Sequence, residues 1–354
     1  MARITFLLSA LLLLAPSASA SVATSSKCPT EAIPALEPAT QAFVDAGANS
    51  TPIYKLSVPA ARAFLENVQA PGSPSLDTVD FKEFNINVGP TGNVNIHLFR
   101  PKNAGEKLLP IIAYFHGGGW ILGSPNTHRR LVLDLMESTG AAVFFVNYTR
   151  APEAQFPVQD EQSFAAVSWL HAGDNAAKLG LDHQRTAFAG DSAGGQLAAA
   201  VNLMSIQKGR KHLLPRFQVL FYPVTDLAVE SCTYTTFAQG PGLAAATLRW
   251  MANAFVPRRE DRRSILASPL LASEKLLAQF PETLVIVAEV DPLRDEGEAF
   301  ARRLSASGVS TTAMRALGTV HDFVLLNALA NTPAARLAIE VAGSGIRKAL
   351  AARA

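Results

Sequence analysis

The sequence predicts an α/β fold in which a mostly parallel central sheet is flanked by helices on both faces. Continuous apolar runs separated by segments long enough for crossover helices are typical of parallel strands that are buried on both sides. Five stretches have this character: LLPIIAYF, AAVFFVNY, RTAFAG, FQVLFYP and ETLVIVAEV. The chain has 354 residues, of which 49% are hydrophobic, so it can bury a core of this size.

Residues 1–20 have the composition of a secretory signal peptide. Arg3 precedes an apolar run over residues 4–15, and the segment closes on ASA at 18–20, a pattern that signal peptidase cleaves. We therefore expect a secreted protein whose mature chain starts near Ser21, with no stable membrane span after cleavage. The alternative is an uncleaved signal anchor in a membrane of the secretory pathway, although the apolar run is short for a bilayer span.

Two cysteines and one glycosylation sequon fit such a compartment. Cys28 and Cys232 can form one disulfide between the N-terminal segment and a later loop, and two unpaired thiols are the alternative. Asn49 opens an Asn-Ser-Thr sequon in a polar segment and is the glycosylation candidate. A second sequon at Asn147 ends an apolar run, so we expect it to be buried.

Residues 21–80 are expected to form a helical cap. Seven prolines between residues 28 and 80 interrupt any long helix and leave room for a short one over 58–69. The main domain is predicted over 81–354 and begins with two alternating, half-exposed stretches that indicate an antiparallel hairpin. Residues 226–265 interrupt the alternation of predicted strands and helices and include a predicted helix over 243–255. We interpret them as an insertion that adds to the cap.

A serine nucleophile is indicated by the G-x-S-x-G pentapeptide at residues 190–194. This pattern, in which Asp191 precedes Ser192, places the serine on a strained turn between a strand and a helix. RTAFAG before it predicts the strand, and AGGQLAAAVNLM after it predicts a helix with small residues in its first turn. The alternatives are a glycine-rich turn with a helix-capping serine, and a phosphate-binding loop that lacks its lysine.

A serine hydroxyl needs a histidine base that is oriented by a carboxylate. If the fold is that of an α/β-hydrolase, these groups occur in the order serine, acid, histidine. His321, in the loop-like stretch LGTVHDF, is the only histidine beyond His212. Asp291 follows the strand ETLVIVAEV directly, which directs its carboxylate from the carboxyl edge of the sheet.

Two other aspartates compete for the role of the acid. Asp295 is followed three residues later by a glutamate and then by an amphipathic stretch, so a helix N-cap accounts for it. Asp226 follows the strand FQVLFYP and is the third candidate. We favour Asp291 because it lies directly at a strand end.

A glycine run follows the strand LLPIIAYF. Bare backbone amides in such a run can approach the oxyanion that forms when a carbonyl is attacked. We expect the N–H groups of Gly117, Gly118 and Gly119, together with that of Ala193, to supply the oxyanion hole. His116 is expected to hold this loop by hydrogen bonds, and a flexible linker is the alternative for the glycines.

Taken in order, the motifs HGGGW, GDSAGG, DPLRDEG and HDF resemble those of the hormone-sensitive-lipase-like family of α/β-hydrolases, the microbial esterases with a G-D-x-A-G motif. The resemblance covers residues 80–330. It implies an α/β-hydrolase fold with Ser192, Asp291 and His321 as a catalytic triad. It also implies a carboxylic ester substrate, commonly with a short or medium acyl chain, and no metal or organic cofactor.

One departure from the family pattern lies beside the histidine. Asp322 stands where glycine is common. Because a carboxylate next to an imidazole favours the protonated form, Asp322→Gly is expected to move the acidic limb of the kcat/KM profile to lower pH.

The leading hypothesis is a secreted serine carboxylesterase that works through an acyl-enzyme on Ser192, with a small-molecule ester as its partner. An amidase or arylacetamide deacetylase of the same family is the alternative. A different class is a non-catalytic small-ligand receptor, since plant gibberellin receptors resemble this family yet lack the catalytic histidine. Lys and Arg number 31 and Asp and Glu 29, which is too balanced to predict a nucleic acid partner.

Overall fold

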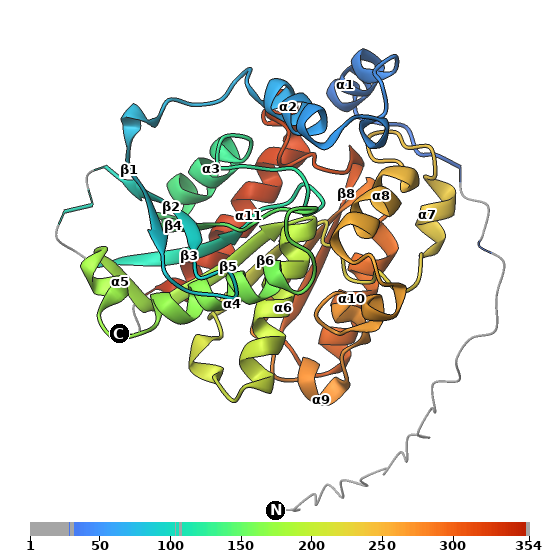
Figure 1. Cartoon of the computed structure of the whole chain (residues 1–354). Helices are drawn as coiled ribbons and strands as arrows, with labels where there is room; N and C mark the ends of the chain where they lie inside the picture. The colour runs from blue at the N-terminus through green and yellow to red at the C-terminus, as the bar shows by residue number, and fades with distance from the viewer. Residues whose placement is uncertain (1–27, 29–31, 103, 106–107, 352–354) are drawn as a thin grey trace, which may run out of the picture.

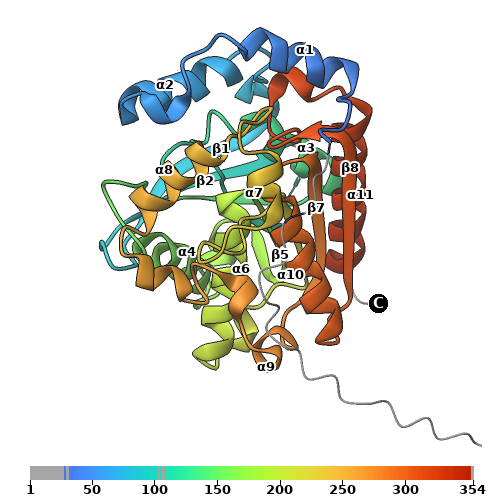
Figure 2. The ribbon, with the colours of Figure 1, turned by 90° about the vertical axis from the view of Figure 1, so that its right-hand side faces the viewer.

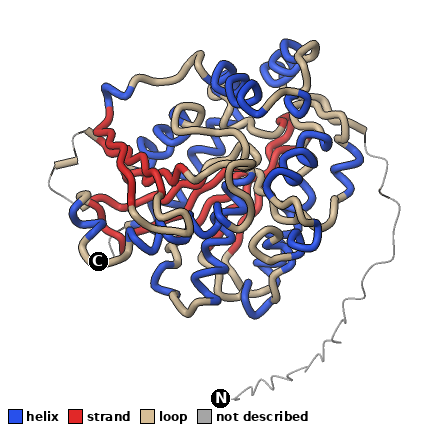
Figure 3. Tube along the Cα trace, in the orientation of Figure 1, coloured by secondary structure: helices blue, strands red, loops and turns tan. Residues whose placement is uncertain are grey.

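The computed structural model describes residues 28, 32–102, 104–105 and 108–351, so the predicted signal peptide lies outside the described residues. One sheet forms the centre of the described chain, with the strand order β1-β2-β4-β3-β5-β6-β7-β8 (Figure 1, Figure 3). Its eight strands are β1 Val79–Ile86, β2 Val94–Pro101, β3 Leu109–Phe115, β4 Ala142–Asn147, β5 Leu181–Asp191, β6 Phe217–Phe221, β7 Glu282–Val290 and β8 Thr311–Val320.

The direction of the strands matches the sequence prediction. Strand β2 is antiparallel to both of its neighbours, β1 and β4, and every neighbouring pair from β4 to β8 is parallel. The hairpin that joins β1 to β2 pairs Ile86 with Val94 across the predicted turn. The predicted α/β fold with a mostly parallel sheet is therefore confirmed.

Helices cover both faces of the sheet because successive strand residues are apolar on both sides. In β3, Ile111 and Ala113 pack into a core with α4 and α6, whereas Ile112 and Tyr114 pack into a second core with α3 and α11. The helices are α1 Pro38–Gly47, α2 Val58–Gln69, α3 Arg129–Thr139, α4 Val158–Leu170, α5 Asn175–Lys178, α6 Ala193–Gln207, α7 Cys232–Thr236, α8 Ala245–Phe255, α9 Glu274–Leu277, α10 Arg294–Ala306 and α11 Pro333–Leu350. Among the described residues, none of these helices is long and apolar enough to cross a bilayer.

Helices α1 and α2 lie together at one end of the molecule (Figure 2). Arg62 of α2 donates 2.8 Å to the carbonyl of Ile121 in the loop after β3. Gln69, at the end of α2, donates 2.7 Å to the carbonyl of Thr127 and 2.9 Å to that of Leu325, beyond β8. The N-terminal segment is thus bonded to the loops that leave the carboxyl ends of two strands.

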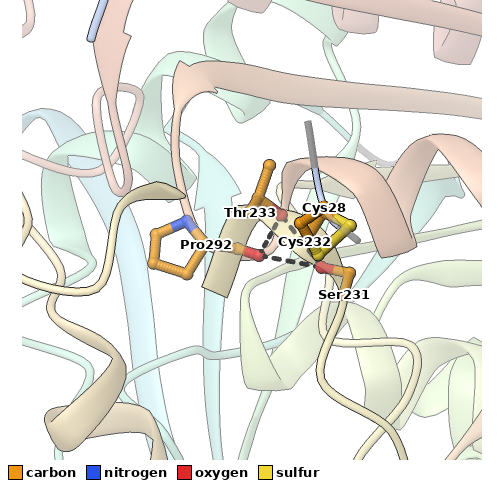
Figure 4. The surroundings of a disulfide bond; sticks show 5 residues. All are labelled: Cys28, Ser231, Cys232, Thr233 and Pro292. Carbon is orange, nitrogen blue, oxygen red and sulfur yellow. Dashed lines mark hydrogen bonds between the residues drawn. A yellow bond between two sulfur atoms is a disulfide. The ribbon is translucent and has the colours of Figure 1, made fainter. Parts of the chain in front are cut away.

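A disulfide ties the start of the described chain to α7 (Figure 4). Cys28 is bonded to Cys232, the first residue of α7. The next residue, Thr233, is fully buried, and its hydroxyl donates 2.6 Å to the carbonyl of Pro292, just after β7. The disulfide therefore anchors the N-terminal segment to a helix that contacts the end of β7.

The two sequons differ in their surroundings. Asn49 follows α1 and is exposed. Asn147, at the end of β4, is half-buried, and its side-chain amide donates 2.9 Å to Asn95. Asn49 is therefore the accessible one of the two.

Candidate active site

Ser192 occupies the turn between β5 and α6, in a backbone conformation that is rare for residues with a side chain. Its φ is 54° and its ψ is −118°. Such strain persists only where surrounding bonds hold it. The Ser192 N–H donates 2.8 Å to the carbonyl of Phe221, and its carbonyl accepts from the N–H groups of Gly195, at 3.0 Å, and Val224, at 3.1 Å. The turn is thereby held between β5 and β6.

The glycines around Ser192 allow the helix to begin this close to the sheet. A Cβ atom on Gly194 would overlap the backbone carbonyl of Phe115 at the end of β3. A Cβ atom on Gly190 would overlap the carbonyl of Gly194. Since these neighbours are backbone atoms, a larger side chain has no space into which to move.

Three side chains that are far apart in the sequence meet at this edge of the sheet. His321 Nε2 lies 3.0 Å from Ser192 Oγ, and His321 Nδ1 lies 2.7 Å from Asp291 Oδ2. Asp291 is fully buried, and its other oxygen, Oδ1, accepts 2.9 Å from the N–H of Leu293. The distances and the order of the groups are those that a serine nucleophile with a general base requires.

The surroundings of His321 favour its protonated form. Burial alone lowers the pKa of an imidazole, but the negative charges of Asp291 and Asp322 and the hydrogen bond to Asp291 outweigh it and raise the pKa of His321 to about 9. Asp322 Oδ1 lies 3.5 Å from Nε2, on the nitrogen that also faces Ser192. The ring of Tyr222 packs edge-on against the imidazole at 4.8 Å between centroids.

The two competing aspartates have other partners. Asp226 Oδ1 accepts from the N–H groups of Ala228, at 2.8 Å, and Val229, at 3.1 Å. Asp295 lies beside Arg294 at 3.1 Å, inside the first turn of α10. The expected N-cap role of Asp295 is wrong, because Leu293 occupies the N-cap position and α10 begins one residue before Asp295.

The glycine run after β3 lies against the turn that carries Ser192. The Gly117 N–H donates 3.0 Å to Asp191 Oδ1, so this amide already has an acceptor. Gly118 and Gly119 have φ values of 94° and 58°, in the left-handed region that glycine adopts without strain. Within the described chain, no hydrogen bond occupies the N–H groups of these two residues, which narrows the predicted oxyanion region to Gly118, Gly119 and Ala193.

Asp191 holds the glycine run through the hydrogen bond to Gly117. Its fully buried carboxylate accepts 2.6 Å from the hydroxyl of Tyr114 and lies 3.2 Å from His128 Nε2, besides accepting from Gly117. Burial alone would raise the pKa of Asp191, but the charge of His128 and the hydrogen bonds from His128 and Tyr114 lower it below the ordinary value. Asp191 is thus a buried anion that joins the glycine loop to the turn that carries Ser192.

His116 lies at the start of the same loop and contacts it with its ring. Its ring stacks on Tyr148 at 4.1 Å between centroids, and its Nδ1 lies 2.9 Å from the carbonyl of Gly117. Burial lowers the pKa of His116 to about 3, so the ring is neutral at physiological pH. A neutral, buried ring is what the predicted role in holding the loop requires, and that role stays a prediction.

Three residues that support the site carry little or no signal in the sequence. Tyr114 lies within an apolar strand, where its only signal is one polar atom in a buried run. His128 belongs to no motif of the sequence and precedes Ser192 in the chain. Thr233 has no motif at all, and its single signal is its position beside Cys232.

The family models place the chain in one family. Residues 112–325 match the model of a family described by its α/β-hydrolase fold. Among relatives, carboxylesterase NlhH of Mycobacterium tuberculosis is 31% identical over 300 residues, which cover 84% of this chain and 91% of that protein. Ethyl acetate hydrolase of Pseudomonas putida is 32% identical over 297 residues, which cover 81% of this chain and 90% of that protein.

Solved esterase structures have the same fold over about nine tenths of this chain. Carboxyl esterase 2 of the mycorrhizal fungus Tuber melanosporum is 44% identical with a TM-score of 0.82, and the match covers 89% of this chain and 99% of that one. A thermostable esterase of Pseudomonas putida is 38% identical with a TM-score of 0.85, and the match covers 91% of this chain and 100% of that one. The chain therefore belongs to the α/β-hydrolase family that contains the hormone-sensitive-lipase-like esterases.

Proposed function

We propose that this carboxylic ester hydrolase is a secreted serine carboxylesterase that cleaves short- to medium-chain esters through an acyl-enzyme on Ser192. The observation that carries the proposal is the continuous line from Ser192 Oγ through His321 to Asp291, with contacts of 3.0 Å and 2.7 Å. No other carboxylate of the described chain lies within 3.5 Å of His321 Nδ1. The esterase relatives support the same class of reaction.

The first half of the reaction acylates the serine. His321 Nε2 takes the proton of Ser192 as Oγ attacks the ester carbonyl, and Asp291 stabilises the resulting imidazolium and holds the ring in place. The imidazolium then gives this proton to the leaving alcohol oxygen. In the second half, His321 takes a proton from water as the water oxygen attacks the acyl carbonyl. The bond between the acyl carbon and Ser192 Oγ then breaks, His321 returns the proton to Oγ, and the carboxylic acid leaves.

The negative oxygen that forms in both halves needs N–H donors that are already in place. We assign this role to Gly118, Gly119 and Ala193, because the Gly117 amide is bonded to Asp191. A donor of this kind contributes on the order of 3 kcal/mol to transition-state stabilisation. Since the donors belong to the backbone, the loop conformation supports catalysis more than any side chain of the loop does.

A restricted site supports the preference for short or medium acyl chains. Ser192 is 5% exposed and His321 is 6% exposed. A Cβ atom on Gly119 would overlap the side chain of Met251 on α8, so the insertion packs directly on the glycine loop. One relative is an ethyl acetate hydrolase by name, which fits a short acyl chain.

A series of p-nitrophenyl esters from acetate to palmitate tests this proposal. We expect the highest kcat/KM with acyl chains of about two to eight carbons. For Ser192→Ala we expect kcat to fall by about a thousandfold or more. Matching p-nitroanilides report amidase activity. Ester hydrolysis by Ser192→Ala at the wild-type rate rules out the mechanism, and anilides that are cleaved faster than esters favour the amidase alternative.

The proposed location outside the cell rests on three features of the chain. These are the signal-like residues 1–20, the disulfide between Cys28 and Cys232, and the exposed sequon at Asn49. Amino-terminal sequencing of the protein from culture medium is expected to start near Ser21. A chain that is retained in membranes with residues 1–20 attached supports the signal anchor instead.

A further inference from the structure

A second carboxylate beside the catalytic base has no hydrogen-bond donor. Asp322 follows His321 directly, and its Oδ1 lies 3.5 Å from His321 Nε2. This oxygen is buried, and within the described part of the chain it accepts no hydrogen bond. Asp291, on the other side of the ring, accepts from both His321 and Leu293. The two carboxylates next to one imidazole are therefore not equivalent.

The backbone holds Asp322 firmly in this place. Its φ of 65° lies in the left-handed region, which is costly for most side chains and tolerated by aspartate. Its carbonyl accepts 2.8 Å hydrogen bonds from the N–H groups of Leu325 and Leu326. Because the backbone of this turn is constrained, the Asp322 side chain has few positions open to it. The turn therefore keeps the carboxylate close to His321 Nε2.

Buried acceptors in native proteins nearly always have a donor, and an unpaired one carries a penalty. Burial raises the pKa of Asp322 to about 6, against the lowering effect of His321, while Asp191 and Asp291 also raise it. Above this pH the group is a carboxylate. Oδ1 itself is buried, whereas the side chain as a whole is 26% exposed, so a small molecule can approach the carboxylate from its exposed side.

The missing donor can come from the substrate. His321 Nε2 gives its proton to the leaving alcohol oxygen across a distance of about 3 Å, which puts that oxygen within about 7 Å of Asp322 Oδ1. In an alcohol with a second hydroxyl on the neighbouring carbon, that hydroxyl oxygen lies about 3 Å from the leaving oxygen. It can donate a hydrogen bond to a carboxylate oxygen about 2.8 Å away. A substrate of this shape therefore reaches from the scissile bond to Asp322.

We propose that Asp322 selects esters whose alcohol carries a second hydroxyl on the neighbouring carbon, as glycol, glycerol and sugar esters do, by accepting a hydrogen bond from that hydroxyl. This inference rests on the proposed esterase function and names the alcohol side of its substrates. Asp322 acts as a specificity-determining residue, separate from the proton transfer that His321 performs.

The test compares 2-hydroxyethyl acetate with 2-methoxyethyl acetate, which has the same acyl group and a leaving alcohol of similar acidity but no donor. Release of acetic acid is followed at pH 8 for the wild type, Asp322→Gly and Asp322→Asn. The measured quantity is the ratio of the two kcat/KM values within each variant, so that any general effect on the basicity of His321 cancels. Glycine tolerates the left-handed turn better than aspartate does, which keeps Asp322→Gly folded.

The wild-type ratio is expected to be about tenfold higher than that of Asp322→Gly, because a hydrogen bond to a charged group is lost. Asp322→Asn, whose amide oxygen still accepts, is expected to lie between them. Asp174→Asn, an exposed aspartate paired with Lys178 on α5, is the matched control and should keep the wild-type ratio. Equal ratios in the wild type and Asp322→Gly overturn the inference.

Hydrolysis of p-nitrophenyl acetate by the same preparations separates the two claims. If the wild type cleaves this ester but the ratios do not differ, only the role of Asp322 fails. If the folded wild type cleaves none of the esters, the proposed function fails, and the inference fails with it.

Discussion

The hydroxyl of Thr233 lies 2.6 Å from the carbonyl oxygen of Pro292, the residue that follows Asp291 (Figure 4). Thr233 belongs to α7, next to the disulfide-bonded Cys232, whereas Pro292 follows β7. The contact thus joins α7 to the loop that carries Asp291, the proposed acid of the triad. Asp291 orients His321, so a small displacement of this loop changes the position of the base.

Thr233→Val tests this connection, because valine keeps the shape of threonine and removes the donor. We expect kcat to fall about tenfold with little change in KM, since the loss affects the position of the base more than substrate binding. Thr233→Ser keeps the donor and should recover most of kcat. Ser231 Oγ also donates to the Pro292 carbonyl, at 3.4 Å, so a Thr233→Val enzyme with wild-type kcat shows that the Thr233 hydroxyl is not needed to position Asp291.

The pH dependence of Asp322→Asn tests the electrostatics of the base. His321 accepts a proton only in its neutral form, and its pKa is raised to about 9 by Asp291 and Asp322 against the effect of burial. Removing the charge of Asp322 lowers this pKa, so a larger fraction of the imidazole is neutral at pH 7. We expect the acidic limb of the kcat/KM profile for p-nitrophenyl acetate to move down by about one pH unit. A limb that stays in place, or moves upward, contradicts the account.

Tyr114→Phe tests the buried anion beneath the glycine loop. The Tyr114 hydroxyl donates 2.6 Å to Asp191, and its loss removes a hydrogen bond to a charged group. We expect the free energy of unfolding to fall by about 1.5–3 kcal/mol, measured by urea denaturation. Tyr54→Phe is the control, since the Tyr54 hydroxyl forms no hydrogen bond within the described chain. Equal stability of the two variants indicates that Asp191 does not depend on Tyr114.

Gly194→Ala tests the close contact between α6 and β3. The added Cβ atom meets the backbone carbonyl of Phe115, which cannot rotate away as a side chain can. We expect loss of most of the esterase activity and a lower melting temperature. Gly47→Ala adds the same methyl group at the end of α1, where no atom lies within 4 Å, and should leave both properties nearly unchanged. Activity of Gly194→Ala close to that of the wild type means that α6 can shift without harm to the nucleophile turn.

Much of the fold follows from local patterns in the sequence. Runs such as ETLVIVAEV are apolar at successive positions because both faces of a covered parallel strand are buried, and this signal needs no knowledge of distant residues. Strand ends are less visible. The stretch LGTV was expected to form a loop, yet β8 continues to Val320, because pairing with Val290 of β7 extends the strand.

The supporting contacts of the site depend on the assembled fold. Gly117 belongs to a run whose amides look equivalent in the sequence, and only the position of Asp191 shows that one of them is occupied. The expected N-cap at Asp295 fails because the turn after Asp291 already starts the helix, with the Leu293 N–H bonded to the Asp291 side chain. Partners such as Thr233 and Pro292 are 59 residues apart, and no local pattern relates them.

The central claim is that Ser192 is the nucleophile, activated by His321 and Asp291. The most direct measurement is the intact mass of the protein after treatment with diethyl p-nitrophenyl phosphate, followed by peptide mapping. The account predicts about one diethylphosphoryl group per chain, located on Ser192, together with complete loss of ester hydrolysis, and no adduct on Ser192→Ala. An adduct on another residue, or a Ser192→Ala protein that still hydrolyses p-nitrophenyl acetate at the wild-type rate, contradicts it.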